Sequence, residues 1–99
     1  MIKLLMTWDI KSDRESEYIE FIMREFGPGM MQTGLQPTDA WYKIYGEGPQ
    51  VLAGAVTDTL QHMHEILTSK EWQELETKLK SFVDNYKRRM VEATGGFQL

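Results

Sequence analysis

"AWYKIYGEGPQVLAGAV", residues 40–56, contains two strand patterns separated by a turn. Ala40–Tyr45 is rich in aromatic side chains, which favour strands. Gly46–Pro49 supplies glycine and proline, the residue types that mark turns. Val51–Val56 has no polar side chain, and an apolar run of this kind is typical of a strand buried on both faces. The segment therefore predicts a β-hairpin.

Upstream of this hairpin, the pattern predicts one strand followed by one helix. Residues 2–10 alternate between two faces, as expected for a strand. One of these faces is apolar throughout: Ile2, Leu4, Met6, Trp8 and Ile10. From Ser12 to Phe26, apolar residues recur at helical spacing. We expect Gly27-Pro28-Gly29 to end this helix, because proline lacks an amide hydrogen and clashes with the preceding turn.

Downstream of the hairpin, two helices are expected. A short helix over residues 60–67 can be capped by Asp58 or Thr59. A second, long helix follows, with one apolar stripe over about six turns. The stripe consists of Trp72, Leu75, Leu79, Phe82, Val83, Tyr86 and Met90. Residues 97–99 are then expected as a short edge strand or tail.

The densest basic run, Lys87-Arg88-Arg89, falls in the last turns of this expected long helix. Cations there complement the carbonyl end of the helix dipole; anion binding is the alternative interpretation. Glu74 with Lys78, and Asp84 with Arg88, place an acid four residues before a base, which is the favourable order on a helix surface. This side of the helix is therefore expected to be solvated.

The expected order of strands and helices, β-α-β-β-α-β, is the split βαβ or ferredoxin-like arrangement of the α+β class. Both helices would cover one face of an antiparallel sheet in a single domain, residues 1–99. The other face would expose a large apolar patch unless it is covered. A second copy of the chain is the simplest cover, so a two-fold homodimer is expected.

Composition limits the classes of function. The 99-residue chain has a net charge of −4 and no cysteine. The acidic balance argues against nucleic-acid binding, which needs a concentrated basic face. The absence of cysteine excludes a disulfide framework and fits a reducing compartment, so a cytoplasmic location is expected. No apolar run approaches a membrane span, and the N-terminus is too polar for a signal peptide.

Three short stretches resemble a known superfamily: Trp8-Asp9-Ile10-Lys11, Arg14-Glu15-Ser16-Glu17-Tyr18 and Leu67-Thr68-Ser69-Lys70-Glu71-Trp72. The chain is similar to the dimeric α/β barrel proteins, in particular the NIPSNAP-like and antibiotic-biosynthesis-monooxygenase-like members. This resemblance implies a ferredoxin-like fold and a homodimer. Haem-degrading members have a tryptophan before the ligand histidine and an asparagine on the first strand. Here Trp72 follows His64 and the first strand has no asparagine, so no haem or other cofactor is expected.

Both histidines lie in "LQHMHEIL", residues 60–67. On a helix, positions two apart differ in direction by about 200°, so His62 and His64 cannot ligate one metal ion together. No metal site is expected, and His62 is expected to face solvent. His64 lies at the edge of the apolar stripe, either as a boundary histidine satisfied by backbone or water, or as a group within reach of a ligand.

Aromatic side chains are concentrated in the segments that would line the space between sheet and helices. With one histidine they form the expected ligand site: Trp8, Trp41, Tyr42, His64 and Trp72. Such sets commonly build apolar pockets, although plain core packing is the alternative. Asp9 and Lys43 are charged positions within apolar strands. They are expected either to meet on the dimer-facing surface, paired or presenting charge to a ligand, or to be exposed at a sheet edge.

No motif in the sequence identifies a catalytic residue. The chain lacks a recognisable nucleophile–base pair, a phosphate-binding glycine loop and a metal-ligand spacing. The function expected is therefore a homodimer that binds a small apolar or aromatic molecule between sheet and helices. A cofactor-independent monooxygenase-like enzyme is one alternative, and a structural or assembly role without a ligand is another.

Overall fold

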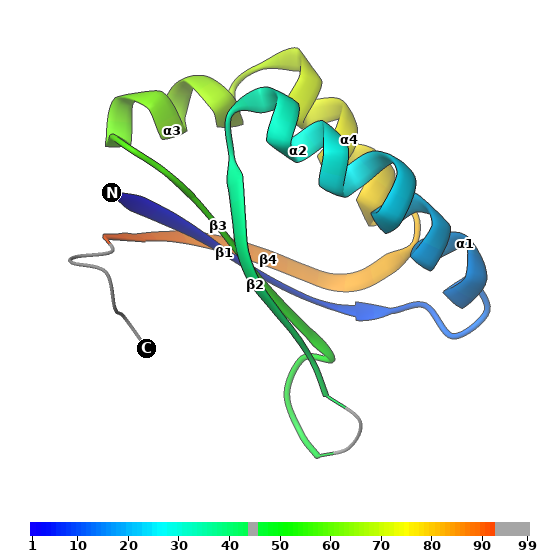
Figure 1. Cartoon of the computed structure of the whole chain (residues 1–99). Helices are drawn as coiled ribbons and strands as arrows, with labels where there is room; N and C mark the ends of the chain where they lie inside the picture. Colours follow the sequence, from blue (N-terminus) through cyan, green and yellow to red (C-terminus); the bar gives the residue numbers. More distant parts are fainter. Residues whose placement is uncertain (44–45, 93–99) are drawn as a thin grey trace.

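The computed structural model describes residues 1–43 and 46–92 and has a four-stranded antiparallel sheet with its helices on one face (Figure 1). The strands lie in the order β2-β3-β1-β4. Their bounds are β1 Ile2–Ile10, β2 Gln36–Tyr42, β3 Val51–Thr57 and β4 Val83–Glu92. This confirms the expected α+β, ferredoxin-like arrangement, with β1 and β3 in the centre of the sheet.

The helices form one layer above the sheet (Figure 1). Their bounds are α1 Glu15–Phe21, η1 Ile22–Phe26, α2 Gly27–Thr33, α3 Leu60–Leu67 and α4 Lys70–Lys80. Thr59 caps α3 and Ser69 caps α4, each by accepting a backbone N–H of the first turn. Among the residues described, no helix combines the length and the apolar character needed to cross a membrane.

The helix break expected at Pro28 is wrong, because helical backbone continues from α1 through η1 into α2. η1 is a π-helical turn, in which the Gly27 N–H donates to the Ile22 carbonyl five residues earlier. The wider turn accommodates a proline that would obstruct a regular α-helix. Gly27 fits this turn closely, since a Cβ there would lie 3.3 Å from the Ile22 carbonyl oxygen. The helix ends instead at Gly34, in a left-handed conformation with φ 105°.

The long helix expected through Met90 is also wrong: α4 ends at Lys80, and the basic run lies on β4. A β-bulge explains the misleading spacing. Asn85, with φ 59°, and Tyr86 together stand opposite Trp8, so one extra residue enters the strand. The apolar positions before and after the bulge are therefore spaced as on a helix. Residues 97–99, expected as the final strand, lie outside the described part.

β2 begins at Gln36, four positions before the expected start at Ala40. Pro37 is tolerated because β2 is an edge strand, where an amide is not needed on the outer side. An irregularity in register between Pro37 and Asp39 accommodates Thr38. The expected end of this strand, at residues 44–45, lies outside the described residues.

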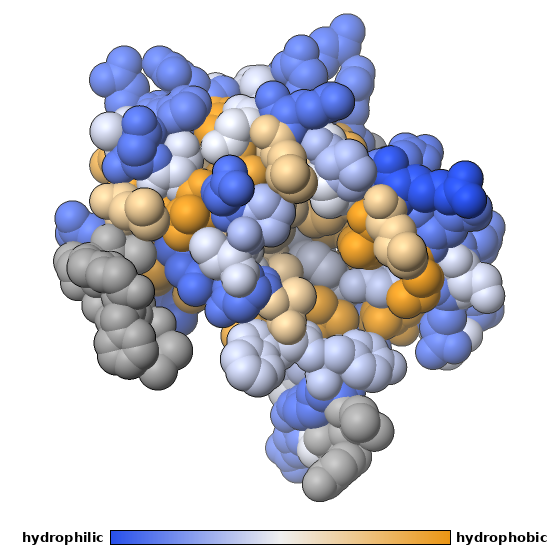
Figure 2. All heavy atoms as spheres, viewed as in Figure 1, coloured by the Kyte–Doolittle hydropathy of each residue, from blue (hydrophilic) through white to orange (hydrophobic). Residues whose placement is uncertain are grey.

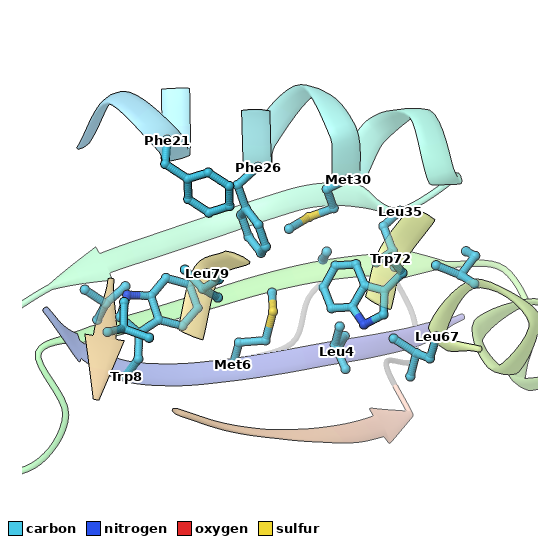
Figure 3. Packing of buried hydrophobic residues seen from close by; sticks show 14 of the residues in the cluster. Leu4, Met6, Trp8, Phe21, Phe26, Met30, Leu35, Leu67, Trp72 and Leu79 are labelled. Atoms are coloured by element: carbon cyan, nitrogen blue, oxygen red, sulfur yellow. The ribbon is translucent and has the colours of Figure 1, made fainter. Parts of the chain in front are cut away.

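A continuous apolar layer joins the helices to the sheet (Figure 3). Leu4, Met6 and Trp8 of β1 point towards Phe26 and Trp72 of the helices, and all five side chains are at most 3% exposed. The aromatic rings contact one another, with Phe26 6.2 Å from Trp8 and 5.9 Å from Trp72 between centroids. Described side chains thus fill the space between sheet and helices at both tryptophans.

One partly buried polar cluster joins α4 to β4. The Glu76 carboxylate accepts from Tyr86 Oη at 2.6 Å and lies 2.7 Å from Arg88 Nε. Burial and this carboxylate raise the pKa of Tyr86. The ion pairs expected within one helix are therefore replaced by pairs between elements, as Lys78 contacts Glu25 of η1 at 2.8 Å.

Candidate functional site

The sheet face opposite the helices has no cover in the described chain, and its side chains form cross-strand rows. Register and strand alternation assign these rows. From β4 to β2 they are Lys87–Thr7–Leu52–Trp41, Arg89–Leu5–Gly54–Asp39 and Val91–Lys3–Val56–Gln36. We call this surface the open sheet face. The outer surface of the helix layer is mainly hydrophilic (Figure 2).

An ion pair occupies the space above Gly54 on the open sheet face. Lys3 Nζ lies 3.4 Å from Asp39 Oδ1. A Cβ at Gly54 would meet Asp39 Oδ1 at 2.6 Å and Lys3 Cε at 2.7 Å, so glycine provides the room for both side chains. Bonds from Thr38 and then Lys3 lower the pKa of Asp39. Opposite charges therefore neutralise each other near the middle of this face.

A hollow of about 320 Å³ lies beside that ion pair. Its lining consists of two leucines, a threonine and three consecutive basic residues: Leu5, Leu52, Thr7, Lys87, Arg88 and Arg89. Within residues 1–43 and 46–92, neither Lys87 nor Arg89 has an acidic partner within 4.0 Å. Apolar surface and uncompensated positive charge are thus next to each other.

Asp9 has a structural role at one end of the sheet. Its Oδ1 accepts from the Gln50 backbone N–H at 2.9 Å, and its Oδ2 accepts from Asn85 Nδ2 at 2.9 Å. These bonds join the start of β3 to the bulge of β4. They also lower the pKa of Asp9, the Asn85 bond most strongly. Lys43 makes no ion pair with Asp9 among the described contacts, so of the alternatives open for these two residues the direct pairing is not formed.

Asp9→Asn is expected to make folding stability less dependent on pH in the acid range. Because the folded pKa of Asp9 lies below its usual 3.8, the stability that it contributes is present above that value and is lost as the pH falls through the folded pKa. Urea unfolding from about pH 5 to pH 2.5 measures this slope. Asp13→Asn, in the turn before α1, is the control. An unchanged slope in Asp9→Asn would contradict the assignment.

A second hollow, a groove of about 710 Å³, lies among α2, α3 and α4 on the helix layer. Four glutamates line it: Glu25, Glu65, Glu71 and Glu74. His62 also lines it, with Nδ1 2.9 Å from both Thr57 Oγ1 and Asp58 Oδ1. His64 is exposed and makes no side-chain hydrogen bond among the described residues. The expected order is therefore reversed, since His62 is the more enclosed histidine.

The aromatic residues expected to form a ligand site do not share a hollow. Trp8 and Trp72 are buried in the core at 2% and 0% exposure. Trp41 and Tyr42 are 65% and 58% exposed, and they point to opposite faces of β2 because they are consecutive in a strand. His64 lies on α3 and is exposed. Of this set, only Trp41 belongs to the open sheet face.

Sequence pattern does not identify the open-face hollow as a ligand site. Leu5, and the apolar β3 segment that contains Leu52, indicate only that the second face of the sheet is apolar. Lys87 and Arg89 are recognisable as part of a basic run, but the apolar spacing around them predicts a helix. In a strand their spacing of two places both on one face, whereas Arg88 points towards Glu76 on the other.

The described residues contain no group of three or more His, Cys, Asp or Glu side chains arranged to hold a metal ion. The open-face hollow is lined by the hydroxyl of Thr7, by cationic side chains and by apolar groups. Its lining offers no carboxylate or imidazole that could act as a base. This set of groups is suited to binding an organic molecule.

The fold and the open sheet face define a class of small ferredoxin-like α+β domains, and solved structures of this class match the chain over nearly its whole length. An uncharacterised NIPSNAP domain protein from Burkholderia xenovorans aligns with a TM-score of 0.71 and 13% identity, covering 99% of both chains. A putative antibiotic biosynthesis monooxygenase from Deinococcus radiodurans gives 0.73 and 16%, covering 100% of this chain and 98% of the other.

An ethyl tert-butyl ether d (EthD) family protein from Bacillus halodurans gives a TM-score of 0.74 at 10% identity, covering 95% of this chain and 100% of that one. The chain therefore has the fold of NIPSNAP domain and monooxygenase-like structures, as the sequence resemblance implies. No family model and no curated protein matches the sequence. At sequence identities this low, the similarity supports the fold alone, and any chemistry has to be inferred from the site itself.

Proposed function

We propose that this chain acts as a homodimer, joined through the open sheet face, that holds a small apolar or aromatic molecule between the two sheets. The observation that carries the proposal is the hollow beside Leu5, Thr7 and Leu52 on an otherwise uncovered sheet. A sheet left bare on one face exposes more apolar area than soluble monomers usually do. Covering the hollow would convert it into an enclosed site.

A second copy of the chain suits this face because of where the charges lie. The central strands contribute Leu5, Thr7, Leu52 and Val56, and the charge of Lys3 is balanced within the same chain. Among the described residues of the three rows, the cations without an acidic partner, Lys87 and Arg89, both lie on the edge strand β4. A two-fold contact brings a surface against itself, and this surface can do so with an apolar centre and a charged rim, the usual anatomy of an interface.

The size of the face is also suitable. Strand spacing of about 4.8 Å and a rise of about 3.3 Å per residue give it roughly 20 by 25 Å in projection. The projection is therefore roughly 500 Å², and protruding side chains bring the accessible area closer to the roughly 800 Å² that each partner buries in a standard interface.

The position proposed for the ligand differs from the one expected from the sequence. The space between sheet and helices is occupied by Met6, Trp8, Phe26 and Trp72, so the hollow on the other side of the sheet is the better candidate. Two of the matching solved structures are of putative antibiotic biosynthesis monooxygenases. The lining of this hollow lacks a base, which favours binding over turnover.

Molar mass in solution, together with uptake of a naphthalene probe, tests this proposal. Sedimentation equilibrium should give twice the chain mass of 11.6 kDa, and the dimer should take up the probe as measured by fluorescence. A monomer at all concentrations would contradict the homodimer. A dimer without uptake would support the structural role instead, and oxygen consumption with phenols would support the enzyme.

A further inference from the structure

We infer that the molecule held in the open-face hollow carries an anionic group, a carboxylate, and that Lys87 and Arg89 bind it. This inference rests on the proposed function, because it requires the hollow to be a ligand site. It specifies the ligand as an aromatic or aliphatic carboxylate with its apolar part against Leu5 and Leu52. The site is therefore expected to bind a neutral molecule of the same shape less tightly than the carboxylate.

The register places both cations at one side of the hollow. Lys87 pairs with Thr7 and Arg89 with Leu5 across β4 and β1, so the two side chains leave the same face of the edge strand. Alternate residues on a strand are about 7 Å apart. Flexible side chains of this length can converge on one carboxylate between them, with the planar guanidinium of Arg89 able to bind both oxygens.

Two other cations near the hollow already have acidic partners. Arg88, between the two cations in sequence, points to the helix side and contacts Glu76 at 2.7 Å. Lys3, the remaining cation of the open sheet face, contacts Asp39 at 3.4 Å. Lys87 and Arg89 are therefore the cations of this face that lack a carboxylate among the described residues. Since the chain has a net charge of −4, this local positive charge is not a consequence of a basic composition.

Dimer formation would increase the need for an anion. Covering the face would reduce the hydration of Lys87 and Arg89 at its rim, and a charge that loses water without gaining a partner costs free energy. A ligand carboxylate offsets that cost, whereas a neutral ligand does not. Carboxylate binding and dimer formation should therefore stabilise each other.

The test compares 2-naphthoate with 2-naphthamide, which share the ring and differ in charge. Isothermal titration of the wild-type protein at low ionic strength should show naphthoate bound at least about tenfold more tightly, as expected for charge-assisted bonds. Lys87→Gln with Arg89→Gln should remove this preference and leave naphthamide affinity within about twofold. Arg24→Gln with Lys70→Gln, one arginine and one lysine on the helix layer, is the matched control and should preserve it.

The outcomes separate the inference from the proposed function. Equal wild-type affinity for both compounds would overturn the carboxylate assignment while leaving ligand binding intact. Failure of a dimer to bind either compound would overturn both. Preference for naphthoate that survives in the Lys87/Arg89 variant would overturn the role of these residues. If this variant does not fold, the wild-type preference and its decrease with added chloride decide the question, and competition by phosphate alone would indicate a general anion site.

Discussion

If the chain forms the homodimer proposed above, Leu52→Asp is expected to convert it into a monomer, with an association constant at least about 100-fold lower. Leu52 lies on β3 in the middle of the open sheet face and is 37% exposed in the single chain. In a two-fold dimer the substitution places one carboxylate on each side of the apolar centre. Both must lose water, and like charges across an interface repel by several kcal/mol. Sedimentation equilibrium over a range of concentrations measures the change.

Leu60→Asp is the matched control for this experiment. Leu60 is also an exposed leucine, at 51%, but it begins α3 on the helix side. An acid in the first turn of a helix is favourable, so Leu60→Asp should remain dimeric. Far-ultraviolet circular dichroism shows whether both variants are folded. A folded Leu52→Asp protein that dimerises like wild type would place the dimer contact elsewhere.

Trp8→Phe is expected to destabilise the fold by about 1–3 kcal/mol more than Trp72→Phe. Both indoles are buried, but Trp8 Nε1 donates to Tyr18 Oη at 3.0 Å, whereas Trp72 Nε1 has no partner among the described residues. Phenylalanine at position 8 leaves the Tyr18 hydroxyl buried without this bond, which costs about 1–3 kcal/mol. At position 72 the same change removes an unsatisfied donor.

Urea unfolding at one fixed protein concentration gives both free energies, because stability would depend on concentration in the proposed dimer. The two substitutions remove the same atoms, so each serves as the volume control for the other. Equal losses, or a larger loss at position 72, would mean that the Trp72 indole N–H is satisfied in solution. An acceptor supplied by a buried water would then have to be present beside this indole.

Several elements could be predicted from local pattern alone. β1 alternates as expected, with Leu4, Met6 and Trp8 buried on one side. The hairpin joining β2 and β3 and the short helix α3 were also predicted correctly, because each has its own turn or cap signal. The expected order of strands and helices is therefore confirmed, although the last strand is β4, in a segment where a helix was expected.

The incorrect predictions of helix ends fall where the backbone departs from regular helix or strand geometry. At Pro28 a π-helical turn accommodates the proline, and no residue pattern in the segment signals that turn. At Asn85 a bulge adds one residue, which changes the spacing of apolar positions from that of a strand to that of a helix. Hydrophobic spacing cannot distinguish a bulged strand from a helix over so short a stretch.

The candidate site was harder to predict because it depends on register. Leu5, Thr7 and Leu52 become neighbours only when β1 and β3 pair, and Lys87 and Arg89 join them only when β4 is a strand beside β1. The aromatic residues that suggested a site were mostly required by the core. Trp8 and Trp72 provide large apolar area in a small domain, and burial alone explains their presence.

Local pattern is enough to predict the α+β class, the central hairpin and a sheet that is apolar on its second face, because alternation and helical spacing are properties of consecutive residues. Which side chains share the open sheet face follows only from the pairing of strands in the folded chain. Because β4 pairs with β1, the basic run that was expected on a helix lies on a strand, with cations beside an apolar hollow. Side chains distant in sequence are brought together by strand register, and a shift of one residue would send each of them to the opposite face.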